Sequence, residues 1–135
     1  MLKKSDTTLF VIDVQGKLAR IMHQADEYVA NLKKLIRGAQ VLGIPIIWTE
    51  QLPEKLGQTI PEIADLFTAK KPLIKKDFSC WRDSGIRTAL KETGSTQFLL
   101  AGIETHVCVY QTAADLLAED YEVQVVADAV SSRTL

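Results

Sequence analysis

Short apolar runs rich in β-branched residues alternate along the chain with segments of helical spacing. Apolar runs of roughly four to eight residues are typical of strands that are buried on both faces, as in a parallel sheet. The runs predict strands over residues 7–14, 44–50, 97–103 and 122–128, with a weaker strand over 72–76.

In the segments between these runs, apolar residues recur every three or four positions, which predicts amphipathic helices. The first helix is expected over residues 28–42, where basic residues occupy the opposite face. Gly43 and then Pro45 form a stop signal for it. Two further helices are predicted at about 84–92 and 106–119.

Strands that alternate with helices are typical of right-handed βαβ units. The pattern therefore predicts an α/β fold: an open, doubly wound parallel sheet with helices on both faces, in a Rossmann-like three-layer arrangement. We expect the strand order 3-2-1-4-5, which would bring the candidate residues just past the strands to one edge of the sheet. Residues 51–69 contain two prolines and a glycine, and we expect a long, functional loop there with a short helix near Pro61. Residues 1–135 are predicted to form a single domain.

Composition and charge exclude several classes of protein. The chain is 47% hydrophobic and 24% charged, which is typical of a globular domain. Its formal net charge of -1 offers no bulk attraction for nucleic acid or an anionic membrane. It shows neither a signal peptide nor a run approaching the roughly 20 apolar residues of a membrane span. Two cysteines are too few for a secreted disulfide framework, so we expect a cytoplasmic protein with reduced thiols.

Open α/β sheets bind ligands beyond the carboxyl ends of their strands. The residues that directly follow the predicted strands are therefore the candidates for a functional site. Asp13 follows the first strand, where a carboxylate is either functional or caps a turn. Lys75 and Lys76 follow the weak third strand, either as a solvated pair or with one lysine directed into the crevice. Cys108 falls at the third position of a helix that Thr105 is expected to cap. Free N–H groups and the helix dipole at that position would lower the pKa of its thiol. The alternative interpretation is that Cys108 is simply a small residue of the core.

Three motifs occur in a fixed order: F-V-I-D-V-Q, K-K-D-F-S and G-I-E-T-H-V-C-V-Y-Q-T-A-A-D. Together they resemble the isochorismatase-like cysteine hydrolases over nearly the whole chain. The segment 49–62, T-E-Q-L-P-E-K-L-G-Q-T-I-P-E, resembles a metal-free isochorismatase-domain branch of that family. Nicotinamidases carry an Asp and a His there as metal ligands, whereas this chain has no histidine between His23 and His106. The resemblance therefore implies neither a metal nor a cofactor.

The resemblance implies a catalytic triad of Asp13, Lys75 and Cys108. The family lysine stands three residues before the aromatic residue of the F-S pair, and counting back from Phe78 gives Lys75, with Lys76 as its neighbour. In the implied reaction, the cysteine attacks a small amide-like substrate and forms a thioester, which water then hydrolyses. Family members often associate, so a homo-oligomer is also expected.

The resemblance further implies a cis peptide bond between Ile103 and Glu104. That bond would turn the N–H of Glu104 toward the N–H of Cys108, and the two donors would form an oxyanion hole. Four residues at or after strand ends are candidates to line the substrate pocket, with core packing as the alternative: Gln15, Gln51, Phe78 and Trp81.

Two readings from other classes stay open. A catalytically silent binding or scaffold protein could keep the same fold. A phospho-receiver domain would use Asp13, but such domains need a cluster of acidic residues for magnesium. His106 lies two positions before Cys108, so the two side chains do not face each other on a helix.

Relatives continue after the D-A-V-S-S-R segment with a helix, a strand and a terminal helix. We therefore expect that unit to be missing here and the fifth strand to be an exposed edge.

Overall fold

A computed structural model describes residues 1–134 of the protein. Five strands form one parallel sheet in the order β3-β2-β1-β4-β5, which confirms the predicted order and direction. The strands are β1 (Thr7–Ile12), β2 (Ile46–Gln51), β3 (Leu73–Lys75), β4 (Gln97–Ile103) and β5 (Glu122–Ser131).

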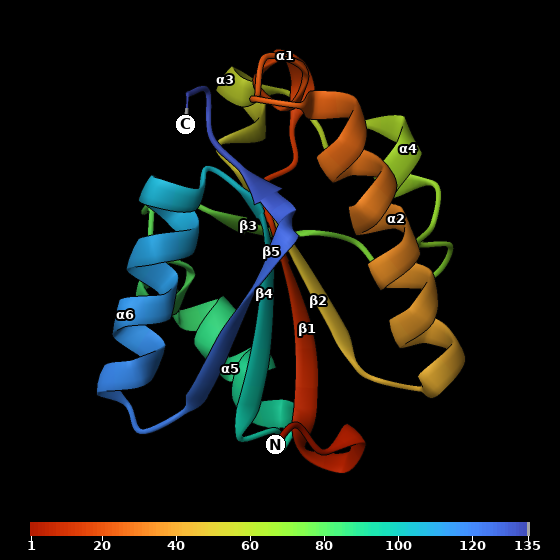
Figure 1. Ribbon diagram of the computed structural model, residues 1–135. Coiled ribbons are helices and arrows are strands. Elements are labelled where there is room, and N and C mark those ends of the chain that lie inside the picture. The colour runs from red at the N-terminus through yellow and green to blue at the C-terminus, as the bar shows by residue number, and fades with distance from the viewer. Residues whose placement is uncertain (135) are drawn as a thin grey trace.

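Helices cover both faces of the sheet, so the molecule has the expected three layers (Figure 1). One face carries α2 (Ala25–Leu42) and α4 (Pro61–Ala64), and the other carries α5 (Ser84–Glu92) and α6 (Tyr110–Ala118). Within residues 1–134, none of the helices combines the length and apolar character that a membrane crossing requires. The shorter elements are the helices α1 (Gly16–Arg20) and α3 (Pro53–Leu56), the 3₁₀ turns η1 (Lys4–Asp6) and η2 (Cys80–Arg82), and the π-helical turn η3 (Thr105–Val109).

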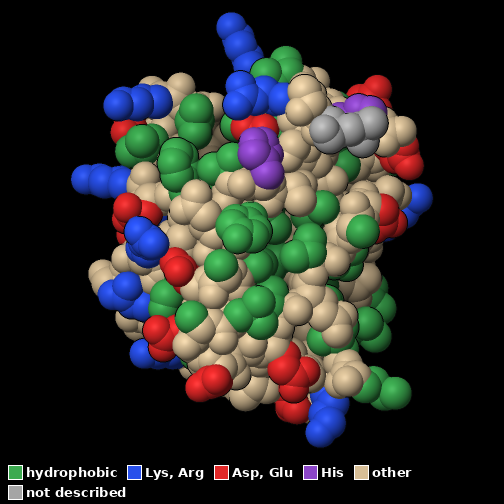
Figure 2. Space-filling model, turned by 60° about the vertical axis from the view of Figure 1, so that its left-hand side comes forward, with side chains coloured by type: hydrophobic (Ala, Val, Ile, Leu, Met, Phe, Trp, Pro, Cys, Tyr) green, Lys and Arg blue, Asp and Glu red, His purple; other side chains and the backbone are tan. Residues whose placement is uncertain are grey.

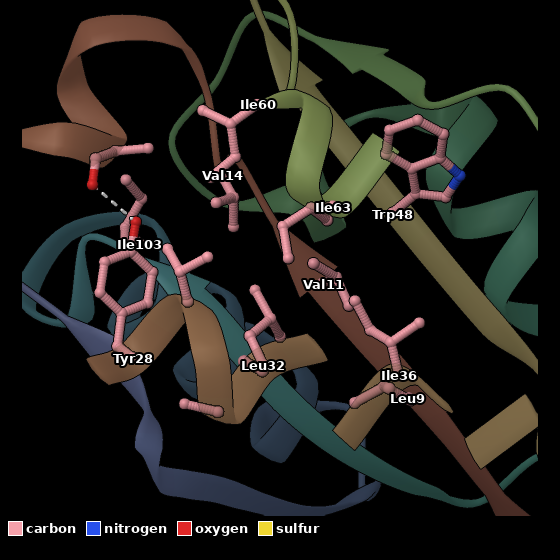
Figure 3. Packing of buried hydrophobic residues seen from close by; sticks show 14 of the residues in the cluster. Leu9, Val11, Val14, Tyr28, Leu32, Ile36, Trp48, Ile60, Ile63 and Ile103 are labelled. Carbon is pink, nitrogen blue, oxygen red and sulfur yellow. Dashed lines mark hydrogen bonds between the residues drawn. The ribbon is translucent and has the colours of Figure 1, made fainter. Parts of the chain in front are cut away.

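Strand β1 is buried on both faces, and its residues alternate between two hydrophobic clusters. Leu9 and Val11 face α2, whereas Phe10 and Ile12 belong to the cluster under α5 and α6. Figure 3 shows Leu9 and Val11 among side chains of α2 and α4. In the same view the Tyr28 hydroxyl of α2 donates a 2.9 Å hydrogen bond to a carbonyl of α1. This two-sided burial explains the continuous apolar run in the sequence.

The helix that carries Cys108 begins differently from the prediction. The N-cap position is Glu104, and Thr105 is the first helical residue rather than the cap. The carbonyl of Glu104 accepts the N–H groups of Val107 and Val109, at 3.1 and 3.3 Å. The second bond spans five residues and makes the first turn π-helical, a geometry that is frequent at functional sites. Cys108 is therefore the fourth residue of this turn, one position further along than expected.

The long segment between β2 and β3 is held against the carboxyl ends of β1 and β2. It contains the expected helix α4 near Pro61 and also α3, which the sequence did not predict. Thr59 forms an antiparallel bridge with Gln15, and its N–H and hydroxyl donate to the buried Glu50 carboxylate at 2.5 and 2.8 Å. A polar anchor of this kind is needed because a buried carboxylate is costly unless it is hydrogen-bonded.

Strands β1 and β4 approach each other closely at Gly102. The residue has a φ of +112°, and a Cβ atom there would overlap the backbone of Ile12. Glycine is required because it alone combines this conformation with the close approach. The next peptide bond, Ile103–Glu104, is cis, as the family resemblance implied.

Candidate active site

Asp13, Lys75 and Cys108 meet at the carboxyl edge of the sheet. Asp13 follows β1, Lys75 ends β3, and Cys108 lies in η3, the turn after β4. The Lys75 Nζ atom lies 2.6 Å from Asp13 Oδ2 and 3.7 Å from Cys108 Sγ. The three residues are only 1–7% exposed. The structure thus forms a buried cluster of an acid, a cation and a thiol.

The Asp13 carboxylate binds side chains rather than capping a turn. Its φ of +50° lies in the left-handed region, which aspartate tolerates better than most residues. Oδ1 accepts a 2.8 Å hydrogen bond from the hydroxyl of Thr49, and Oδ2 pairs with Lys75. Thr49 was not singled out in the sequence. Its role follows only from the adjacency of β1 and β2, which places it beside Asp13.

Lys75, and not the exposed Lys76, points into the site. Lys75 ends β3 opposite Gln51 of β2, so its side chain must cross β2 to reach Asp13. β3 and β1 are roughly 10 Å apart because β2 lies between them, and the long lysine side chain spans this distance. The ammonium donates to Gln51 Oε1 at 2.9 Å and to the carbonyls of Asp77 and Phe78 at 2.9 and 3.0 Å.

These contacts keep Lys75 charged. Burial acts to lower its pKa, but the Asp13 carboxylate, followed by Cys80 and Cys108, raises the pKa above its ordinary value. A buried ammonium is costly unless it is paired and hydrogen-bonded, and this one is both. Asp13 and Lys75 thus form a buried ion pair beside the thiol.

The Cys108 thiol is protonated at rest, so the expectation of an acidified cysteine is wrong. Burial, and after it the Asp13 carboxylate, raises the pKa of Cys108 to about 12, whereas Lys75 opposes the shift. The S–H group donates to Gln51 Oε1 at 3.4 Å. The residue is 7% exposed, and burial there disfavours the anionic sulfur more than the neighbouring Lys75 favours it.

The second thiol, Cys80, lies near the cluster but is fully enclosed. Its Sγ atom is 4.0 Å from the Thr49 hydroxyl, and its N–H donates to Thr112 Oγ1 at 3.0 Å. Burial is the main cause that raises the pKa of Cys80 to about 12. With 0% exposure it offers no access to a substrate in this conformation.

The four expected pocket residues occupy different environments. Gln51 contacts both Lys75 and Cys108. Phe78 accepts a hydrogen bond from Lys75 through its carbonyl, and the residue is 52% exposed. Trp81 packs in the core, edge-on to Tyr121 at 5.6 Å between ring centroids.

Gln15 is the fourth of these residues, and it is fully buried. Its side-chain amide donates to the carbonyls of Gln51 and Gly57 at 3.0 and 2.7 Å and accepts the N–H of Gln51 at 2.7 Å. Its polar atoms therefore hold the end of β2 in place rather than face an open pocket.

Glu104, beside the cis peptide bond, is tied to the end of β5. Its carboxylate is buried and accepts from the backbone N–H and the Nε atom of Arg133, both at 3.3 Å. Sequence reasoning did not predict this contact, because the two residues lie 29 positions apart. The bond fixes the segment that leads into the cysteine turn.

A large hollow lies beside the cluster rather than in it. Its volume is about 770 Å³, and His23, Tyr28, His106 and Asp128 are among its lining residues, without the triad. Across residues 1–134, His, Cys, Asp and Glu side chains form no group of three or more that could hold a metal ion.

The protein is thus an α/β protein with an open parallel sheet and a buried site at the carboxyl ends of its strands. In that site an aspartate–lysine ion pair lies against a cysteine thiol. The profile of the isochorismatase domain matches residues 7–135. The chain belongs to the isochorismatase family.

Similar curated proteins include two isochorismatase domain-containing proteins from fish. Protein 1 from Salmo salar is 37% identical over 96% of this chain and 45% of its own length. Protein 2 from Danio rerio is 39% identical over 98% of this chain and 66% of its own length. The chain thus spans about half to two thirds of the length of these relatives.

Solved structures with the same fold include one from a nematode and two from bacteria. One is described as a MAR1 ribonuclease from Caenorhabditis elegans, with a TM-score of 0.89 and 38% identity over 98% of this chain and 68% of that one. The YcaC product of Escherichia coli, described as an octameric hydrolase of unknown specificity, gives 0.92 and 26% over 98% and 67%. YcaC from Pseudomonas aeruginosa, with hexane-2,5-diol and covalent acrylamide, gives 0.90 and 28% over 98% and 67%.

Proposed function

We propose that this protein is a cysteine hydrolase that cleaves the C–N bond of a small amide-like substrate through a thioester. The observation that carries the proposal is the buried pair of Asp13 and Lys75 in contact with Cys108. A nucleophilic thiol needs a nearby base and a compensating positive charge, and this cluster supplies both.

In the first half of the reaction, Asp13 takes the proton from the Cys108 thiol as the sulfur attacks the acyl carbon. The S–H bond breaks, an S–C bond forms, and the carbonyl electron pair moves to oxygen. The tetrahedral intermediate then collapses as its C–N bond breaks, and Asp13 returns the proton to the leaving amine. Lys75 keeps the local charge balanced while the proton resides on Asp13.

In the second half, water attacks the thioester. Asp13 accepts a proton from the water as the new C–O bond forms. The C–S bond then breaks, the carboxylic acid product leaves, and the proton on Asp13 restores the Cys108 thiol. The same carboxyl group thus serves as base and acid in both halves.

The backbone N–H groups of Glu104 and Cys108 are the proposed donors to the developing oxyanion. Two such donors held by backbone need no reorganisation during the reaction. The bond between Glu104 and Arg133 supports the proposal, because it restrains the segment that would present the first donor.

Among the relatives, the Pseudomonas aeruginosa structure with covalent acrylamide agrees with a reactive nucleophile in this family, since acrylamide alkylates thiols. The description of the Caenorhabditis elegans protein as a ribonuclease raises RNA cleavage as a second candidate. We rank the amide higher, because a net charge of -1 gives little bulk attraction for a polyanion.

The test is a screen of small primary and secondary amides, with a labelled RNA as a separate arm. We expect turnover of an amide by wild type, no loss of activity with chelators, and no turnover by Cys108→Ala. Asp13→Asn should lose on the order of a hundredfold or more in kcat, since it removes the base. Lys75→Ala should also be impaired, with the exposed Lys76→Ala as its matched control.

Retained amide turnover in Cys108→Ala would exclude the cysteine mechanism. RNA cleavage without amide turnover would favour the second candidate. A folded wild type that cleaves neither substrate class would support the silent binding or scaffold protein.

A further inference from the structure

We propose that the Gln51 side chain, together with the Asp13 carboxylate, holds Cys108 as a protonated thiol in the resting protein, and that the S–H passes from Gln51 to Asp13 when the nucleophile reacts. The inference rests on the proposed cysteine mechanism and adds a named residue that controls the reactivity of the thiol.

The orientation of the Gln51 amide is set by its neighbours. Its Oε1 atom accepts from Lys75 Nζ at 2.9 Å and from Cys108 Sγ at 3.4 Å, while Nε2 points to the carbonyl of Lys76 at 3.5 Å. If the amide were reversed, its NH₂ group would face the ammonium and its oxygen would face a carbonyl. The buried cation therefore selects the orientation in which the oxygen faces the sulfur.

An oxygen in that position favours the thiol over the thiolate. It accepts a hydrogen bond from S–H, but its lone pairs repel an anionic sulfur. The charged and titratable groups around Cys108 are the Asp13 carboxylate, the Lys75 ammonium and the Cys80 thiol. Asp13 disfavours the thiolate as Gln51 does, and Lys75 favours it.

Lys75 gives a thiolate at Cys108 only part of the stabilisation that a free ammonium would give, because it also binds several oxygens. Its ammonium donates to three oxygens, on Gln51, Asp77 and Phe78, at 2.9 to 3.0 Å, and forms an ion pair with Asp13 Oδ2 at 2.6 Å, whereas its hydrogen bond to the Cys108 sulfur is longer, at 3.7 Å. Loss of the Gln51 oxygen would leave three oxygen acceptors for three donors. The lysine would thus stay satisfied in a variant without the amide, and such a variant is expected to fold.

The experiment measures the rate of Cys108 alkylation by iodoacetamide against pH, with the labelled cysteine identified by mass spectrometry. Gln51→Met removes the oxygen and keeps a side chain of similar volume. It should speed the labelling of Cys108 at pH 8 by at least about threefold and move the midpoint of the rate–pH profile to lower pH. Gln51→Glu puts an anion beside the sulfur and should slow labelling and raise the midpoint. The exposed Gln58→Met serves as the matched control and should match wild type.

Unchanged or slower labelling in a folded Gln51→Met protein would overturn the proposal. If neither variant folds, Gln51→Asn takes their place, because it keeps the amide but draws its oxygen away from the sulfur. Its Cys108 should be labelled faster than in the wild type at pH 8, and an equal or slower rate would overturn the proposal. None of these readouts needs an amide substrate, so the failure of the proposed hydrolase activity would be seen separately.

Discussion

At Cys108 the effects of burial and of two neighbouring charges compete, and burial has the largest effect on the pKa of the thiol. The sequence shows a cysteine early in a helix and a lysine nearby, both of which favour a thiolate. It does not show that the residue is 7% exposed or that Asp13 lies beside its thiol. A base in direct reach is therefore needed during catalysis, and Asp13 fills that role in the proposed mechanism.

This arrangement predicts the pattern of cysteine labelling. Substoichiometric iodoacetamide should label Cys108 before Cys80, because Cys80 has no exposed surface. The raised pKa of Cys108 means that its thiolate form grows as pH rises toward about 12, so the rate should keep increasing above pH 9 without a plateau near 8.5. Peptide mass spectrometry measures both cysteines, and the labelled protein should be inactive on its substrate. Faster labelling of Cys80 would contradict the assignment of the nucleophile.

At the scale of single elements, local signals located most of the regular structure. Strand β4 and helix α5 lie at the predicted residues, because a β-branched run and an amphipathic stripe specify them locally. The short helices α1 and α3 were missed, since elements of four or five residues depend on tertiary contacts. The N–H of Gly16 at the start of α1, for instance, donates to the carbonyl of Gln58, 42 residues away.

Two glycines allow a test of the contact between β1 and β4. Gly102→Ala should destabilise the protein by about 3 kcal/mol or more, because the added Cβ would overlap the backbone of Ile12 at a φ of +112°. Gly38→Ala in α2 meets nothing within 4 Å and should stabilise the protein by about 0.5–1 kcal/mol. Urea unfolding measures both variants, and a neutral Gly102→Ala would show that the strands can separate at no cost.

At the scale of the whole molecule, apolar side chains remain on the surface. Figure 2 shows hydrophobic side chains gathered in the middle of one face, below a histidine. Exposed apolar residues of α6 and β5 include Tyr110, Leu117 and Val125, at 66%, 56% and 42%. Such patches favour association, and the Escherichia coli YcaC structure is described as octameric. A homo-oligomer and a cytoplasmic location both stay predictions for this protein.

The prediction of a homo-oligomer is tested by light scattering across a dilution series in the micromolar range. We expect a mass that is a multiple of the 15.0 kDa chain and that falls on dilution only if the association is weak. A monomeric mass at every concentration would contradict the prediction. Aggregates without a fixed mass would indicate exposed apolar surface rather than a specific assembly.

The sequence by itself determined the alternation of strands and helices, the parallel sheet and the edge at which Asp13, Cys108 and one of the two lysines lie. Those features depend on local hydrophobic periodicity and on the rule that parallel strands present their carboxyl ends at one edge, whereas the choice of Lys75 over Lys76 came from the family resemblance. The tertiary structure decided which atoms meet there. Contacts of Thr49 with Asp13, of Gln51 with Cys108 and of Arg133 with Glu104 join residues 29 to 57 positions apart. Burial, which sets the protonation of the thiol, is likewise a property of the packed molecule, because it depends on how the layers close over the site.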